Sequence, residues 1–216
     1  SSGDPEFDST TGKVSKTVGA AYAKGQGTVI DISQATGNTF GTGTATPTRN
    51  YNIDIKGAQV KDSATSKMLD MYTGFGLFAE GGAKIQANNN KVKAEDTGAA
   101  IASKDTNSKV VLDGGEVYYK GSGFALFAKD GGEISLQQGK LTLDGKATGF
   151  SVDYSVSTSS QPINLTGTAV NIDSDDAILM SVKNATNLNT TGMGTNLLSK
   201  VNLTPASIGG SATRYK

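Results

Sequence analysis

Three aspartates close together in the sequence form the densest group of side chains that could do chemistry. Asp173, Asp175 and Asp176 lie in the run NIDSDDA. Carboxylates in pairs cleave glycosidic bonds as acid and base, and clustered carboxylates bind Ca²⁺. A lyase would also need a basic residue nearby, and the nearest is Lys183, seven residues after Asp176. A polysaccharide lyase or hydrolase is therefore one hypothesis for this chain.

The same aspartates also fit a simpler interpretation as turn residues. They fall just before a strand of the repeat described below, at the position equivalent to Glu95-Asp96. The chain contains no His and no Cys, which removes the commonest general acid/base and the thiolate ligands of zinc. No calcium-binding Gly-Gly-x-Gly-x-Asp nonapeptide or Asp-x-Asp-x-Asp-Gly loop occurs. We predict no catalytic residue, no metal site and no cofactor.

The balanced charge of the chain argues against nucleic acid and anionic membranes as partners. The 20 basic residues balance the 20 acidic residues, so no strong field attracts nucleic acid or an anionic membrane. No run approaches the roughly 18 apolar residues of a membrane-spanning helix. The first seven residues, SSGDPEF, are typical of a cloning remnant, so we leave residues 1–7 out of the fold prediction. Residues 8–216 are expected to form a single elongated domain.

A repeat of about 25 residues organises the chain, and such a period is typical of stacked or radial repeat folds. The segment Thr73–Ala79 (TGFGLFA) is matched by segments that begin at Thr97, Ser122 and Thr148. Each begins with a hydroxyl residue and Gly, and the spacings are 24, 25 and 26 residues. A weaker fifth copy begins near Ala177.

Two further apolar series recur at matching offsets within the repeat. They are Ile85, Val110, Ile134 and Ile163, and Val92, Val117, Leu141 and Val170. Apolar and polar residues alternate around them, which is the pattern of a strand with one dry face. Turns such as Asp113-Gly114-Gly115 and Asp130-Gly131-Gly132 separate the strands, since Gly and Asp accept positive φ. Each repeat therefore contains three short strands.

These features predict an all-β fold, a right-handed parallel β-helix with three strands per coil and about 25 residues per coil. A β-propeller is the main alternative, but its repeats are usually longer, with four antiparallel strands. Besides the two series above, we expect two core ladders in the first strand of each coil. These are Phe75/Ala99/Phe124/Phe150 and Leu77/Ile101/Leu126/Val152.

The segments before the repeat fit less well. Ile53 and Ile55 with Val60 are predicted to supply the second and third strands of a coil, and Val29–Ile32 to form part of another. Three polar insertions are expected to be side loops: Thr36–Arg49, Ser63–Lys67 and Ser155–Gln161. The polar tail from Asn184 onward is expected to form an end of the stack.

The repeat resembles the passenger regions of Gram-negative autotransporters, most closely the large fusobacterial-type outer-membrane adhesins. The resemblance rests on Thr/Ser-Gly-Phe-x-Leu-Phe-Ala followed by an acidic-Gly-Gly turn and Ile-x-Leu, and it covers residues 53–182. It implies a surface-displayed stalk or adhesin exported through an outer-membrane barrel, with a host protein, a glycan or another bacterium's surface as partner. Without a signal peptide or translocator barrel, the chain would be a monomeric fragment of a longer passenger. A trimeric phage-type fibre is a third hypothesis.

Three aromatic residues are candidate ligand contacts. If Phe75 points inward, strand alternation turns Phe78 outward, and Phe127 follows by the same logic. Two outward rings two coils apart would form a shallow apolar stripe that could bind a protein or a sugar, or be covered by the 63–67 loop. Tyr118 is a second exposed candidate, with a solvated strand position as the simpler interpretation.

Overall fold

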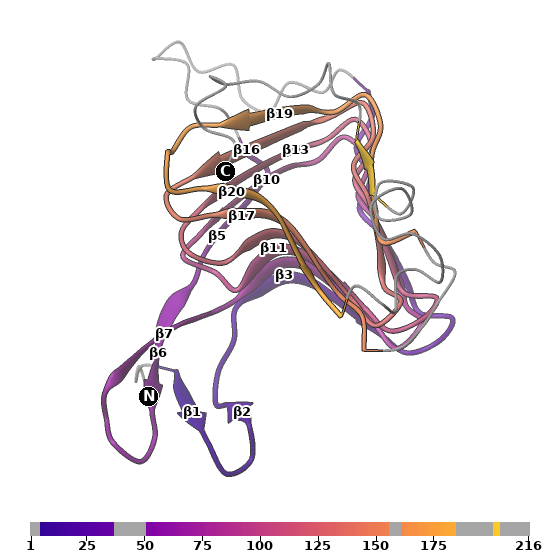
Figure 1. Cartoon of the computed structure of the whole chain (residues 1–216). Helices are drawn as coiled ribbons and strands as arrows, with labels where there is room; N and C mark the ends of the chain where they lie inside the picture. Colours follow the sequence, from indigo (N-terminus) through magenta and orange to yellow (C-terminus); the bar gives the residue numbers. More distant parts are fainter. Residues whose placement is uncertain (1–4, 37–50, 156–160, 185–200, 204–216) are drawn as a thin grey trace.

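Three parallel sheets run side by side along the protein, as the computed structural model shows (Figure 1). The structure describes residues 5–36, 51–155, 161–184 and 201–203. Within this part of the chain there are strands and turns and no α-helix. The chain passes through the three sheets in rotation, and we call one strand from each sheet with its turns a coil. This arrangement is compatible with a β-helix.

Each sheet takes every third strand of the coiled part of the chain. Sheet B contains β3 (Gly19–Lys24), β8 (Phe75–Glu80), β11 (Ala99–Lys104), β14 (Phe124–Lys129), β17 (Thr148–Asp153) and β20 (Ile178–Lys183). Sheet C contains β4 (Val29–Asp31), β9 (Lys84–Gln86), β12 (Lys109–Val111), β15 (Glu133–Ser135), β18 (Ile163–Leu165) and β21 (Val201–Leu203). Sheet D contains β5 (Ile53–Lys56), β10 (Lys91–Glu95), β13 (Glu116–Lys120), β16 (Lys140–Asp144) and β19 (Ala169–Ile172).

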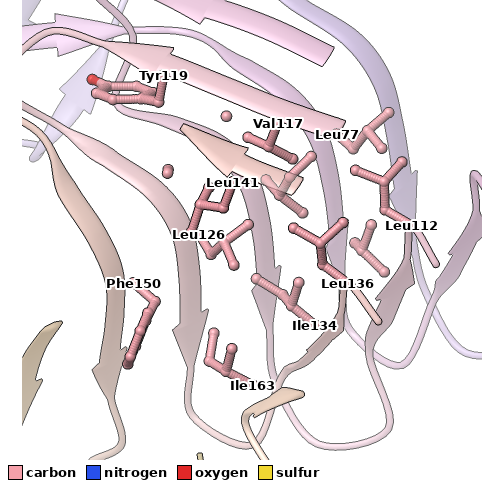
Figure 2. Packing of buried hydrophobic residues seen from close by; sticks show 14 of the residues in the cluster. Leu77, Leu112, Val117, Tyr119, Leu126, Ile134, Leu136, Leu141, Phe150 and Ile163 are labelled. Carbon is pink, nitrogen blue, oxygen red and sulfur yellow. The ribbon is translucent and has the colours of Figure 1, made fainter. Parts of the chain in front are cut away.

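Two of the predicted ladders are confirmed. Ile85 pairs with Val110, Val110 with Ile134, and Ile134 with Ile163, and all four side chains are buried. In sheet D the predicted series Val92, Val117, Leu141 and Val170 is likewise in register and buried. Figure 2 shows Val117, Leu141 and Ile134 in the interior between the sheets. Every pairing in these sheets is parallel, which excludes the antiparallel blades of a propeller.

The ladders of sheet B were predicted only in part. Leu77, Ile101 and Leu126 align and are buried as expected. The fourth copy of the repeat, in β17, is shifted by two residues, because Leu126 pairs with Phe150 and Ala128 with Val152. The prediction that Phe150 continues the Phe75 series was therefore wrong. Both predicted core side chains of β17 still enter the core, since Phe150 and Val152 are buried.

Phe75 and Phe124 lie outside the core, contrary to the prediction. The alternation is interrupted in this sheet, because Ala100 and Ile101 are consecutive and both belong to the buried core. Gly76 occupies the same place one coil earlier, where an added Cβ would lie 3.0 Å from Val92 Cγ1 in the interior. When two consecutive residues point inward, the residue before them points outward, although strict alternation from the second of them would place it inward. Phe75 is thereby turned to the outer face.

The corners of the coils use Gly for two different reasons. Gly131 has a φ of +96°, which a residue with a Cβ rarely adopts. Gly132 has no such φ, but a Cβ there would lie 2.2 Å from the carbonyl oxygen of Ser103 in the coil below. Asp113 closes another corner by accepting hydrogen bonds from Ser135 Oγ at 2.7 Å and from the Gln137 amide at 2.9 Å. The Gly-Gly signals in the sequence therefore mark positive φ and close backbone contact.

The first coil differs from its prediction in the assignment of two strands. Ile30 of β4 pairs with Ile85, so this segment is part of a coil as expected, but it shares that coil with Ile53 and does not belong to another one. Ile53 pairs with Val92 and thus lies in the third strand of the coil, where the second was predicted. Val60 is buried outside the three sheets, in β6, so its assignment to the coil was wrong.

A fourth sheet, sheet A, projects from the corner between β5 and β8 (Figure 1). It consists of β1 (Glu6–Asp8), β2 (Lys13–Val14), β6 (Ala58–Asp62) and β7 (Met68–Thr73). Residues 63–67 are the connection of the β6–β7 hairpin, as expected for a side loop. Strand β1 pairs with β6 through Glu6 and Phe7, so part of the segment that we left out of the fold prediction is in a strand.

Parts of the other predicted loops and of the tail lie outside the described residues, namely 37–50, 156–160, 185–200 and 204–216. The strands on either side of 156–160 remain in register with their neighbours, as Ile134 pairs with Ile163. Within the tail, β21 continues sheet C by pairing Val201 with Ile163. The stack of strands therefore extends beyond Asn184.

Candidate binding surface

An aromatic cluster lies on the outer face of sheet B, over its first two strands. The ring centroids of Phe75 and Phe78 are 5.5 Å apart in an edge-to-face arrangement. Tyr22 of the neighbouring strand lies 5.4 Å from Phe78 and 6.0 Å from Phe75. These separations are typical of favourable aromatic contacts. The three rings therefore support one another on the surface.

A second pair of rings lies two coils further along the same face. Phe124 and Phe127 are stacked with ring centroids 5.0 Å apart and ring planes 14° apart. Ala99 and Ala102 occupy the equivalent positions in the coil between the two groups. We call the surface formed by Tyr22, Phe75, Phe78, Ala99, Ala102, Phe124 and Phe127 the aromatic stripe. The Phe75–Phe78 group and the Phe124–Phe127 pair lie two coils apart, about 10 Å along the axis, and Tyr22 extends the first group by one coil.

The stripe is partly open to solvent. Tyr22 is 46 % exposed, and the four Phe side chains are half-buried, whereas Ala102 between them is only 7 % exposed. The outward orientation predicted for Phe78 and Phe127 is confirmed. Tyr22, Phe75 and Phe124 were missed as surface residues, although Phe-x-x-Phe occurs at Phe75 and again at Phe124. This repeated spacing was the available signal.

Gly19 makes room for one of the rings. It is in register with Phe75 on the neighbouring strand, and an added Cβ would lie 2.1 Å from Phe75 Cε2. The Phe75 ring thus covers the backbone of Gly19, where a strand would otherwise lack a side chain to pack. At this end of the stripe, the large Phe75 side chain packs over the space left by Gly19.

A charged cluster borders the stripe at Glu80. The hydroxyl of Tyr22 donates a hydrogen bond to the Glu80 carboxylate, and Lys24 Nζ lies 3.0 Å from the same Oε1. Lys104 Nζ lies 3.9 Å from Oε2. Burial alone would raise the pKa of Glu80, but the Tyr22 hydrogen bond and the Lys24 ion pair hold it below its usual value. Glu80 therefore stays ionised and fixes the orientation of the Tyr22 ring.

The border continues as one column of side chains along sheet B. Lys24, Glu80, Lys104 and Lys129 follow one another in register, and Asp153 and Lys183 extend the column. The turn residue Asp130 adds a carboxylate beside the lysines. Burial alone would raise the pKa of Asp130, but hydrogen bonds from Ser155 and the charges of Lys129 and Lys104 lower it. The column thus contains four lysines and two carboxylates, with Lys104 and Lys129 next to each other, and Asp130 adds a third carboxylate beside them.

Tyr118 lies on a different face, the outer side of sheet D. Its hydroxyl donates a hydrogen bond to Asp144 Oδ2 at 2.9 Å, and its ring centroid is 6.1 Å from that of Tyr51. Burial and the hydrogen bond to Asp144 raise the pKa of Tyr118. Lys120 Nζ lies 3.4 Å from the same carboxylate oxygen. The hydroxyl of Tyr118 is thus already engaged within the protein, and this residue is not part of the aromatic stripe.

Ion pairs cover much of the outer face of sheet D. Lys93 Nζ lies 3.2 Å from Glu95 Oε1 and 3.8 Å from Asp54 Oδ2. Lys91 Nζ lies 3.7 Å from Glu116 Oε1. Sheet C carries a small open hollow with polar walls, lined by Lys109, Glu133, Ile134, Ser135, Gln137, Gln161 and Asn164. The stripe therefore differs in character from the faces beside it.

The three aspartates lie in the turn between β19 and β20, where the repeat predicts them. Asp173, Asp175 and Asp176 are all exposed. The Asp176 amide donates to Ser174 Oγ at 3.3 Å, and the Asp173 amide to the Leu143 carbonyl at 2.8 Å. Lys183 is exposed at the far end of β20. In the described ranges, no three acidic side chains come together in a way that could hold a metal ion.

Comparisons with known proteins do not identify a relative. No family model, no curated protein and no solved structure matches the chain. Among the described residues, no helix could span a membrane. The function must therefore be argued from the repeat and from the surface.

Proposed function

We propose that the chain is a right-handed parallel β-helix with about 25 residues per coil, and that it is a passenger segment of an autotransporter. It would be displayed on the surface of a Gram-negative bacterium after export through an outer-membrane barrel. There it acts as an adhesin or stalk without catalysis. The proposal is supported by the Thr/Ser-Gly-Phe-x-Leu-Phe-Ala repeat and by the three parallel sheets.

The aromatic stripe is the observation that carries the adhesive part of the proposal. A pure stalk needs only a buried core, and its outer faces can be polar throughout. Here five rings gather on the outer face of sheet B, while the outer face of sheet D has several ion pairs and a single aromatic contact, between Tyr51 and Tyr118. A concentrated apolar surface with a charged border is typical of an interaction site.

The partner would bind by apolar contact with the aromatic rings, which a rigid stack of strands holds in place. The buried ladder of Leu77, Ile101 and Leu126 belongs to the strands that carry the Phe rings and stays in register through successive coils, so the outer positions are held at a fixed spacing. The rings are therefore oriented before a partner arrives, and little side-chain freedom is lost on binding. Fully burying one such ring contributes about 1.5–3 kcal/mol. The partner is a protein or glycan of a host cell, or the surface of another bacterium.

Adhesion of the purified chain to cells tests the proposal. Beads coated with the chain are expected to retain epithelial cells or other bacteria, and beads coated with a Tyr22→Ser/Phe78→Ser/Phe127→Ser variant to retain far fewer. Circular dichroism and thermal melting establish that the variant is folded. Loss of cell binding in the variant supports an adhesin. If the wild-type chain retains no cells, the adhesive role is wrong and a stalk remains. A crystal structure checks handedness and coil length.

A further inference from the structure

We infer that the aromatic stripe binds an uncharged polysaccharide chain that lies along the axis of the stack, with one sugar ring on each group of aromatic rings. This inference rests on the proposed adhesive function and names the class of its ligand. Three features of the stripe support it: the spacing of its rings, the balance of its bordering charges and the hydrogen-bonding groups along its edge.

The spacing of the rings suits an extended polymer. The Phe75–Phe78 group and the Phe124–Phe127 pair are separated by the alanines of one coil, so the groups recur about 10 Å apart. An extended glycan whose successive sugars alternate in orientation presents the same face at every second sugar. The flat C–H faces of sugars pack on aromatic rings. A ligand along the axis would therefore meet a ring group with every second sugar.

The bordering charges are complementary to a ligand without net charge. Glu80 is paired with Lys24 at 3.0 Å and faces Lys104 at 3.9 Å. The charges of Lys104 and Lys129 both act on Asp130. The lysines beside the stripe thus have carboxylates close to them within the protein. A nucleic acid or a sulfated glycan would require uncompensated positive charge, which favours a neutral polymer.

The same border supplies hydrogen-bonding groups of both kinds. Carboxylate oxygens accept and ammonium groups donate, and both kinds of group stand in one column of sheet B at the border of the stripe. A sugar hydroxyl is both donor and acceptor, so it can bond to either partner.

The test uses neutral β-linked oligosaccharides, of β-1,4-glucan and of β-1,4-linked N-acetylglucosamine, with heparin oligomers as the charged comparison. Isothermal titration with the whole chain is expected to show binding of one neutral series that tightens once the oligomer spans both ring groups. Phe78→Ala and Phe127→Ala are each expected to weaken it by about tenfold or more. Tyr118→Ala, which removes an outer ring from sheet D, is the matched control and should leave affinity unchanged.

Several outcomes would overturn the inference while leaving the adhesin intact. One is cell binding by the wild-type chain without affinity for neutral oligomers. Another is equal oligosaccharide affinity of the Phe78→Ala and Tyr118→Ala variants. A third is binding of heparin alone that weakens as salt is added. Cell binding that survives glycosidase treatment but is lost on protease treatment would assign a protein partner instead. A wild-type chain that binds neither cells nor oligomers contradicts both proposals. Thermal melting of each variant excludes unfolding as the cause of lost binding.

Discussion

The phenol hydroxyl of Tyr119 lies 2.5 Å from the carbonyl oxygen of Thr97, to which it donates a hydrogen bond in the buried interior. The same hydroxyl accepts a hydrogen bond of 2.8 Å from the amide of Gly123. The Tyr119 side chain thereby provides hydrogen-bond partners for two backbone groups at the corner between sheets D and B. Figure 2 shows the Tyr119 hydroxyl. Burial raises the pKa of Tyr119 to about 12, so the hydroxyl keeps its proton at neutral pH.

Replacing Tyr119 with Phe should destabilise the protein by about 1–3 kcal/mol, because the Thr97 carbonyl and the Gly123 amide lose their partner away from water. Urea unfolding followed by circular dichroism measures the loss. The control is Tyr118→Phe in the same strand, whose hydroxyl bonds to the half-exposed Asp144. An equal loss in both variants would argue against a special role for the buried hydroxyl.

Shortening a side chain of sheet C should lower the stability of the protein strongly only where that side chain points into the core. Ile134 is 1 % exposed between Val110 and Ile163, so Ile134→Ala leaves a cavity and should cost about 2–5 kcal/mol. Val111→Ala, at a half-buried position of the same sheet, should cost clearly less. Thermal unfolding of both variants compares them. Equal costs would mean that the inward and outward positions of this sheet are wrongly assigned.

Charge reversal in sheet D should weaken the stacking of neighbouring coils. Glu116 stands in register between Lys91 and Lys140, and Glu116→Lys would place three positive charges in one column. We expect a lower melting temperature at low salt, with a loss of about 1 kcal/mol that shrinks at high salt because of screening. Glu116→Gln, which removes the charge without reversing it, should lie between the wild type and the reversal. A loss independent of salt would exclude an electrostatic cause.

Acid should release the contact between Asp144 and Tyr118. Burial alone would raise the pKa of Asp144, but hydrogen bonds from Tyr118 and Gly145 and the nearby Lys120 lower it. A carboxyl whose pKa is lowered by folding stabilises the protein above its unfolded pKa, and this stabilisation is lost as the pH falls through the folded pKa. The free energy of unfolding should therefore fall below about pH 4.

Asp144→Asn measures this contribution. The variant should be less stable than the wild type at neutral pH, and the difference should narrow in acid, because the wild-type carboxyl is then protonated as well. Tyr118→Phe should show a smaller change of the same sign, since Gly145 and Lys120 still act on the carboxylate. A difference that stays constant with pH would show that ionisation of Asp144 does not contribute.

The sequence alone determined the register of two sheets. Ile85, Val110, Ile134 and Ile163 recur with turn residues at matching offsets, and only like positions can stack when each strand buries one face. The position of Asp173, Asp175 and Asp176 in a turn followed from the same repeat. The outward orientation of Phe78 and Phe127 was predicted correctly from the buried Leu before each of them, although the inward orientation assumed for Phe75 was wrong.

Only the tertiary structure decided which Phe side chains face outward and which residues form the aromatic stripe. Phe75 and Phe124 face outward because two consecutive residues after them enter the core, a local backbone irregularity that strict strand alternation does not predict. Tyr22 joins the stripe from a strand that precedes the clear repeats by about fifty residues, with a side sheet inserted between. Periodicity fixes which residues stack on one another, whereas contacts across an insertion depend on how the chain returns to the stack.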